Sequence, residues 1–347
     1  MPSSPAAPDP READEHPALI LANLGTPAEP RPRAVRSFLR EFLSDRRVVE
    51  MHPLLWRPVL EGIILRVRPR ASAAKYATVW RPGEETSRSG SPLMHYSERQ
   101  SELLQQELGE SVQVRVAMRY GQPALRRVMD ELMEAGCRRI ALLPLYPQYA
   151  ASSAGTVVDE AARFILASRN QPELRTVRSF ETAPAYIEAL ATALEQHWRV
   201  HGRPDPAAGE RLLLSFHSIP QAMHDAGDPY RAECERTVEL LSQRLNLPDG
   251  LAQLTFQSVF GPAAWIGPAT IDTVGELGRA GCPRLDVICP GFLSDCLETL
   301  EEINQLNRET FTTAGGGSFY YIPWGNDSDG AITTLAEQAR NVLAGWI

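Results

Sequence analysis

A histidine ends one of the most apolar segments of the chain. Residues 211–220 read RLLLSFHSIP, so that His217 follows three leucines, a serine and a phenylalanine. An imidazole titrates near neutral pH and is a common metal ligand, and this side chain could therefore accept a proton or hold a metal ion. A single histidine at the end of a strand is also often a structural residue, so its function depends on its neighbours.

Acidic side chains follow a second apolar run. Residues 289–307 read CPGFLSDCLETLEEINQLN, and in a helix Asp295, Glu298 and Glu302 would form one stripe. Such acids also complement a helix dipole, and Asp295 with Glu298 fits a capping box. If the stripe and an imidazole faced one cleft, they would suit a hard-to-borderline cation such as Fe²⁺.

Aromatic residues mark two further loops. Residues 256–270 read FQSVFGPAAWIGPAT, where two Gly-Pro pairs hold Trp265 in a rigid loop, either to cap the core or to stack on a flat ligand. Residues 145–156 read LYPQYAASSAGT and contain Tyr149. The chain has neither G-x-G-x-x-G nor G-x-x-x-x-G-K-[ST], which argues against nucleotide or nicotinamide chemistry.

Strand-like and helical segments alternate through most of the chain. The expected strands are residues 18–25, 112–118, 139–146, 175–180, 211–217, 254–259, 284–290 and 319–324. Most of these are continuous apolar runs, as is typical of strands that are covered on both faces. Alternating strands and helices predict an α/β fold with parallel, doubly wound sheets.

The chain also repeats itself. Residues 123–143 (PALRRVMDELMEAGCRRIALL) resemble residues 268–288 (PATIDTVGELGRAGCPRLDVI), and the shared cysteines, Cys137 and Cys282, are 145 residues apart. A weaker similarity links residues 19–27 with residues 212–220. If these two segments are equivalent, His217 aligns with Leu24, and packing alone does not require a histidine there. Strand ends of this kind border the ligand cleft of open α/β sheets.

The repeat predicts two similar Rossmann-like domains, each a parallel sheet flanked by helices, with the active-site cleft between them. We expect them to span residues 18–170 and 171–310, with the last strand and helix (311–347) packing back on them. The first residues, 1–17, are rich in proline and acid and are expected to form a disordered tail.

Composition excludes several classes of function. The net charge of −8 disfavours a nucleic-acid partner. Five scattered cysteines without a C-x-x-C motif argue against a disulfide framework and favour a cytoplasmic setting. The first residues lack the apolar core of a signal peptide, and no apolar stretch approaches the ~20 residues of a membrane span.

Residues 52–70 form an apolar segment with four arginines. Val59, Leu60, Ile63, Ile64 and Val67 keep helical spacing. The segment fits an amphipathic helix packed on its own domain, or a lip that admits a greasy, acid-bearing ligand or touches a membrane surface.

These motifs together resemble the ferrochelatases, the enzymes that insert Fe²⁺ into a porphyrin to make haem, and above all their bacterial forms. The resemblance runs from residue 18 to about residue 345, and its most specific motifs are LSFHSIP, FQSVFGPAAWIGPAT, CPGFLSDCLETLEEI, YPQYAASSAG, MRYGQP and ANLGTP. It implies a lyase of haem biosynthesis whose substrates are ferrous iron and a porphyrin, most simply protoporphyrin IX. It also implies a cytoplasmic monomer or homodimer, with peripheral contact to the inner membrane face as an option.

The resemblance assigns roles to individual residues. It implies that His217 and Glu298 are catalytic and contact the metal, and that Asp295 and Glu302 line a path for metal and protons. It implies that the porphyrin cleft is lined by Leu24, Arg119, Tyr120, Tyr149 and Trp265, with Leu24 and His217 on opposite faces of the ring.

Two departures from the family pattern stand out. Cys296 occupies a position that is often histidine in the family, and a thiol prefers softer metals than Fe²⁺. No cysteine follows Cys296, and Ala150-Ala151 stand where some cluster-bearing forms have a cysteine, so we expect no [2Fe-2S] cluster. The alternatives are a chelatase for another metal and tetrapyrrole, or a non-catalytic porphyrin carrier.

Overall fold

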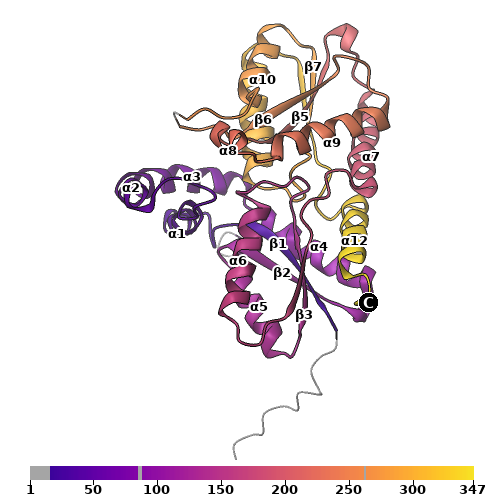
Figure 1. Cartoon of the computed structure of the whole chain (residues 1–347). Helices are drawn as coiled ribbons and strands as arrows, with labels where there is room; N and C mark the ends of the chain where they lie inside the picture. The colour runs from indigo at the N-terminus through magenta and orange to yellow at the C-terminus, as the bar shows by residue number, and fades with distance from the viewer. Residues whose placement is uncertain (1–15, 85–87, 262) are drawn as a thin grey trace, which may run out of the picture.

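Parallel strands form two separate sheets, which lie one above the other in Figure 1. The computed structural model describes residues 16–84, 88–261 and 263–347. In the order β2-β1-β3-β4, the first sheet contains β1 (Ala18–Gly25), β2 (Gln113–Tyr120), β3 (Arg139–Pro144) and β4 (Glu173–Thr176). In the order β6-β5-β7-β8, the second contains β5 (Arg211–His217), β6 (Ala252–Gln257), β7 (Arg284–Ile288) and β8 (Ser318–Ile322). This confirms the predicted α/β fold with two parallel sheets.

The inner strands β1 and β5 are buried on both faces. Residues 18–22 and 212–214 have no exposed surface, as their continuous apolar sequence predicts. Alternate side chains of each strand belong to different cores. Leu21 and Leu214 face one large core that is shared by both halves, whereas Ile20 and Leu213 face separate cores on the outer sides of their own sheets.

Helices cover both faces of the first sheet. One face packs against α5 (Leu125–Glu134) and α6 (Ala154–Ala167), and the other against α4 (Pro92–Leu108). An arm of α1 (Pro32–Leu43), α2 (Pro53–Val59), the π-helix η1 (Leu60–Ile64) and α3 (Leu65–Val79) projects to one side, as Figure 1 shows. Short 3₁₀ turns, η2 (Arg88–Gly90) and η3 (Gly109–Ser111), flank α4.

The second sheet is covered in the same way. The π-helix η5 (Glu298–Asn307), α10 (Thr270–Arg279) and α11 (Arg308–Thr313) cover its outer face. On the shared-core face lie α7 (Pro184–His201), α9 (Tyr230–Leu245) and α12 (Asp329–Leu343), and α12 also packs on α4 of the first half. The turn η4 (Pro206–Ala208) precedes β5, and the short helix α8 (Gln221–Asp225) follows it.

The internal repeat predicted from sequence is confirmed. Residues 123–143 contain α5 and β3, and residues 268–288 contain α10 and β7, in the same order and place in their sheets. Equivalent backbone bonds precede each helix: the Met118 N–H donates to the Pro123 carbonyl at 2.7 Å, and the Phe256 N–H to that of Pro268 at 2.9 Å. The weaker similarity also holds, because β1 and β5 are the corresponding strands.

Two expected boundaries differ from those observed. Strand β4 pairs with β3, so the first sheet continues past residue 170. Pro17, assigned to the tail, is buried, and its carbonyl accepts a hydrogen bond from the Gln113 N–H. The rest of the expected tail, apart from His16, lies outside the described residues. Within the described ranges, no helix has the length and apolar character to cross a membrane.

Candidate active site

A cleft of about 580 Å³ lies between the two halves of the molecule. This volume is within the roughly 300–1,000 Å³ of small-molecule sites. The first half contributes residues from α1, α3 and the ends of β1 and β3, and the second half contributes the end of β5, the loop after β6, and η5. The cleft therefore lies beyond the carboxyl ends of both sheets, where ligands bind in open α/β folds.

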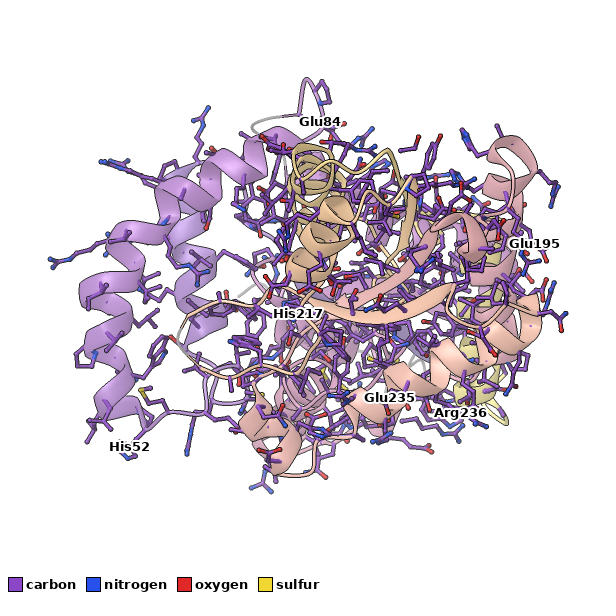
Figure 2. All side chains as sticks on the ribbon, turned by 90° about the horizontal axis from the view of Figure 1, so that it is seen from above. His52, Glu84, Glu195, His217, Glu235 and Arg236 are labelled. Atoms are coloured by element: carbon purple, nitrogen blue, oxygen red, sulfur yellow. The ribbon has the colours of Figure 1, made fainter. Side chains whose placement is uncertain are left out.

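His217 reaches this cleft from the end of β5. Figure 2 labels it near the middle of the view, with the helical arm to its left. Its Nδ1 lies 2.5 Å from the Ser218 carbonyl oxygen. A carbonyl only accepts, so Nδ1 carries a proton, and in the neutral form of this ring the lone pair is on Nε2. Leu24 lines the same cleft from the end of β1, as the alignment of the two segments predicts.

Two of the three predicted acids also line the cleft. Glu298 begins the π-helix η5, and its backbone carbonyl accepts a hydrogen bond from Gln257 Nε2 at 2.8 Å. Glu302 lies four residues further along this helix, and its carboxylate accepts hydrogen bonds from the Ser258 N–H at 2.6 Å and Oγ at 2.5 Å. π-helices are rare and frequently mark functional sites.

The electrostatics of Glu302 connect it with the other site residues. Burial raises the pKa of its carboxyl group, and the negative charge of Glu298 raises it further. The hydrogen bonds from Ser258 and the nearby His217 act in the opposite direction on this pKa. The imidazole and the two carboxylates are therefore close enough to influence one another.

Asp295 does not line the cleft. Its carboxylate accepts hydrogen bonds from the Tyr321 hydroxyl at 2.5 Å, the Thr299 hydroxyl at 2.7 Å and Asn326 Nδ2 at 2.7 Å. The residue is buried, and its own N–H donates to Asn326 Oδ1. A carboxylate with three donors around it holds the start of η5 in place and has little capacity left for a ligand.

Arg119 and Tyr120 are also absent from the cleft lining. Both side chains turn to Asp45, which accepts from Arg119 Nη2 at 2.5 Å and from the Tyr120 hydroxyl at 3.0 Å. Arg119 Nε donates to the Thr156 carbonyl. This buried cluster fixes the connection between α1 and α2, which supplies Val48 and other apolar residues of the cleft wall.

Of the two remaining predicted residues, one lines the cleft and the other does not. Trp265 lines the cleft, and its Nε1 donates to the Phe260 carbonyl at 2.9 Å. Tyr149 does not line the cleft. Its ring lies under the Arg178 guanidinium, 4.4 Å from the ring centroid. The cleft tyrosine of that loop is Tyr146, whose hydroxyl is buried without a hydrogen-bond partner in the described part of the chain.

Cys296 lies in the cleft wall and packs with Leu93, Met94 and Met118. Burial raises the pKa of its thiol well above the ordinary value, and the negative charge of Glu298 adds to the shift. A thiol in this setting stays protonated, and a protonated thiol is a poor metal ligand.

Several cleft residues were not predicted from sequence. Lys75 and Tyr76 reach the cleft from α3, and Glu301 reaches it from η5, whereas Arg68, also in the lining, belongs to the segment that was offered as a lip for an acid-bearing ligand. Burial raises the pKa of the Tyr76 phenol, with a further contribution from the Glu298 charge. Residues 52–70 were expected to form an amphipathic helix, but its continuation through residue 79, which carries Lys75 and Tyr76, gave no separate signal.

A ready-made metal centre is not present in the described residues, since no three of their His, Cys, Asp and Glu side chains come together as a ligand set. His217, Glu298 and Glu302 nevertheless face one cleft whose other walls are largely apolar. Such a site can hold a flat apolar ligand and offer it an imidazole and carboxylates on one side.

Comparison with known proteins gives consistent matches over nearly the whole chain. The model of the Ferrochelatase family matches residues 16–343. The chain is 48% identical to the Ferrochelatase of Dechloromonas aromatica (95% of this chain, 88% of that protein). It is 48% identical to the Ferrochelatase of Aromatoleum aromaticum (96% and 89%) and 46% identical to that of Chromobacterium violaceum (94% and 88%).

Solved structures with the same fold are more distant in sequence. SirB from Bacillus subtilis with Fe³⁺ matches with a TM-score of 0.53 at 14% identity, over 73% of this chain and 92% of that one. The sirohydrochlorin chelatase SirB from Bacillus subtilis subspecies spizizenii, in complex with cobalt, matches with a TM-score of 0.52 at 10% identity, over 94% and 95%. At these identities the likeness concerns the fold.

Proposed function

The chain belongs to the ferrochelatase family, and from this premise we propose that His217, Glu298 and Glu302 divide the reaction between proton removal and metal delivery. The chain is a lyase of haem biosynthesis that inserts ferrous iron into a porphyrin to form haem. The observation that carries the assignment of residues is that an imidazole and two carboxylates face one largely apolar cleft.

Insertion of Fe²⁺ requires the porphyrin to lose two pyrrole N–H protons while the metal loses water. His217 accepts a pyrrole proton at Nε2, because Nδ1 is already protonated and bound to the Ser218 carbonyl. The same lone pair is the one that could ligate the iron, so proton acceptance and ligation exclude each other at any moment. We assign proton acceptance to His217 first.

Glu298 and Glu302 deliver the metal. Carboxylate oxygens are suitable replacements for the water ligands of Fe²⁺. Ser258 orients Glu302 through two hydrogen bonds, and the location of both acids on η5 provides a route along one helix. Asp295 serves this route indirectly, because it fixes the first turn of the helix.

Apolar side chains hold the ring. Leu24 and His217 approach from different halves, as the predicted sandwich requires, and Trp265 and Phe260 provide flat surfaces in the loop after β6. Arg119 and Tyr120 support the opposite wall through Asp45 and do not touch the ring directly. Tyr146 takes the place in the cleft that was expected for Tyr149.

The preferred porphyrin is protoporphyrin IX. The cations of the cleft lining, Arg68 and Lys75, both come from α3, and seven residues of helix separate them by about 10 Å along its axis. Protoporphyrin IX carries its two carboxylates on one edge, which matches a cleft with cations on one side. Coproporphyrin III has carboxylates on all four pyrroles and would place some of them against apolar walls.

The protein acts in the cytoplasm and contacts the membrane surface peripherally through the arm. Leu60 and Leu65 are buried in the arm, but Leu54, Ile63 and Val67 are 77%, 58% and 68% exposed. Arg57 and Arg66 lie on the same segment, as in helices that bind anionic membrane surfaces. We call Leu54, Ile63 and Val67 the apolar ridge.

The enzyme acts without an iron–sulfur cluster. All five cysteines are buried, and they lie in widely separated segments of the chain except for Cys282, Cys289 and Cys296. Cys282, Cys289 and Cys296 are the nearest to one another in sequence, and their thiols have raised pKa values because of burial. Protonated, buried thiols are poor cluster ligands.

The proposal is tested by anaerobic assay of the purified protein with Fe²⁺ and either protoporphyrin IX or coproporphyrin III. The expected result is haem formation with the higher kcat/KM for protoporphyrin IX. Tight porphyrin binding without turnover would support the carrier alternative. Turnover only with cobalt or nickel and a more reduced tetrapyrrole would support the other chelatase.

A further inference from the structure

One ion pair crosses the cleft. Lys75 Nζ on α3 lies 2.8 Å from Oε1 and 2.9 Å from Oε2 of Glu301 on η5. Both side chains line the cleft, and they belong to different halves of the molecule. Among the ion pairs of the described residues, no other joins two side chains of the cleft lining. The pair therefore links the arm to the helix that carries Glu298 and Glu302.

The two partners differ in their surroundings. The Lys75 side chain is 47% exposed, whereas that of Glu301 is only 14% exposed. Lys75 can therefore leave the pair for another anion at the cleft mouth and stay solvated. Glu301 has no such freedom, since it sits in the cleft wall on the same helix as two other carboxylates. The other cation of the cleft lining, Arg68, lies over the Phe260 ring at 4.8 Å.

We infer that Lys75 changes partners during the reaction cycle: it neutralises Glu301 in the empty cleft and moves to a carboxylate of the porphyrin when the ring binds. This inference rests on the proposed function, because it takes the ligand to be an acidic porphyrin. It makes Lys75 a positioning residue that couples the occupation of the cleft by the porphyrin to the charge of the metal-binding wall.

Simple electrostatics supports the exchange. Lys75 gives up one carboxylate for another, so the exchange changes the free energy of the lysine little. It leaves Glu301, which is only 14% exposed, without a counter-ion on the helix that also carries Glu298 and Glu302 into the cleft. Neighbouring carboxylates disfavour one another's charge, and a divalent cation relieves this repulsion. Bound porphyrin thus raises the affinity of the wall for Fe²⁺, and by linkage the metal raises the affinity for an acidic porphyrin equally.

The test measures Mn²⁺ binding by the whole protein without porphyrin, from the EPR signal of the free ion. Mn²⁺ is a probe that prefers oxygen ligands. In Lys75→Met, Glu301 has lost its cation, so the dissociation constant for Mn²⁺ should fall by about fivefold or more. The double variant Lys75→Met with Glu301→Gln should return to the wild-type value. An unchanged constant in Lys75→Met, or no reversal in the double variant, would overturn the inference.

A matched control separates this effect from the loss of any cross-element ion pair. Arg340→Met removes the pair between Arg340 and Glu107, which has a 2.6 Å contact and joins α12 to α4 outside the cleft. It should leave Mn²⁺ binding unchanged. The two substituted side chains, Lys75 and Arg340, are about half exposed, so both variants should fold normally. Circular dichroism checks this.

A second arm tests the porphyrin side of the exchange. Mn²⁺ binding is repeated with N-methylprotoporphyrin, whose alkylated nitrogen blocks insertion, and with its dimethyl ester. N-methylprotoporphyrin should tighten Mn²⁺ binding by the wild type, whereas its dimethyl ester should not. In Lys75→Met, the acid and the ester should have the same effect on the dissociation constant for Mn²⁺. Equal effects of acid and ester on the wild type would overturn the inference. Each preparation is also assayed for iron insertion: a wild type without it contradicts the proposed function, whereas normal insertion without Mn²⁺ coupling contradicts only the role of Lys75.

Discussion

Leu24 and His217 occupy corresponding ends of the two inner strands, β1 and β5, and both line the cleft between the halves. The same structural position therefore occurs once in each half of the molecule. It is filled once by a side chain that can only pack and once by a side chain that can transfer a proton. The asymmetry locates the chemistry on the second half and gives the first half the task of holding the ring.

The first prediction concerns His217. His217→Ala should lower kcat for iron insertion by about 100-fold or more, because it removes the Nε2 lone pair that accepts the proton. Anaerobic assay with Fe²⁺, or aerobic assay with Zn²⁺ as a surrogate, measures the loss. His201→Ala, which alters an exposed histidine on α7, is the control and should keep normal turnover. Near-normal turnover in folded His217→Ala would refute the assignment.

The outcome for the polar residues shows what the sequence could predict. His217 and Glu298 were predictable because each follows a buried strand of a parallel sheet, and such ends meet at the ligand cleft. Arg119 and Asp295 also lie near strand ends, but their side chains turn away from the cleft. Their partners, Asp45 and Tyr321, are 74 and 26 residues away, and no local pattern predicts such pairs.

The fold itself was predictable for a different reason. Continuous apolar runs and the repeated helix–strand unit are local signals, so the strands β1 and β5 were placed with their observed bounds. The boundary between the two halves could not be predicted from local sequence, since it depends on the pairing of β4 with β3. Sequence spacing predicts an ordinary helix over residues 298–307 and gives no signal for the wider turn of the π-helix η5.

Asp295 should affect stability more than chemistry. Asp295→Asn replaces an acceptor that serves Tyr321, Thr299 and Asn326 with an amide, which must point one N–H group at a donor. The expected cost is about 1–3 kcal/mol in the free energy of unfolding. Urea denaturation measures it, and kcat should fall less than in Glu298→Gln. A loss of activity equal to that of Glu298→Gln, without loss of stability, would place Asp295 on the metal path after all.

Glu302 should give a pH-dependent contribution to stability. Its pKa is raised in the folded state, chiefly by burial, so the folded protein holds this proton more tightly than the unfolded chain does. The contribution is complete below the ordinary glutamate pKa and is lost as pH rises through the raised pKa. In Glu302→Gln this loss is absent, so relative to wild type the variant should gain stability between pH 4, below the ordinary glutamate pKa, and pH 7.5.

Urea denaturation of both proteins at the two pH values measures this difference, because the other titrating groups are common to both. The amide oxygen that Glu302→Gln introduces can still accept from Ser258, which keeps the comparison close. A stability difference that does not change with pH would contradict the raised pKa.

Cys296 should be dispensable for iron insertion. Its thiol is buried and its pKa is raised, so it contributes packing against Leu93 and Met118 and does not bind Fe²⁺ as a thiolate. Cys296→Ala should keep most of the Fe²⁺ activity and cost about 1 kcal/mol of stability. Steady-state assay and thermal denaturation measure the two quantities. A loss of activity comparable to that of His217→Ala would show that the thiol takes part in handling the metal.

The apolar ridge should govern membrane contact. Ile63→Glu places a charge on an exposed side chain between Leu54 and Val67, and full burial of such a side chain contributes about 1.5–3 kcal/mol. The variant should lose co-sedimentation with vesicles of phosphatidylglycerol and phosphatidylethanolamine, while its turnover with detergent-dispersed porphyrin stays normal. Val200→Glu changes a side chain that is 78% exposed on α7, away from the arm, and should bind vesicles as the wild type does. If both variants bind vesicles equally well, the apolar ridge does not contact the bilayer.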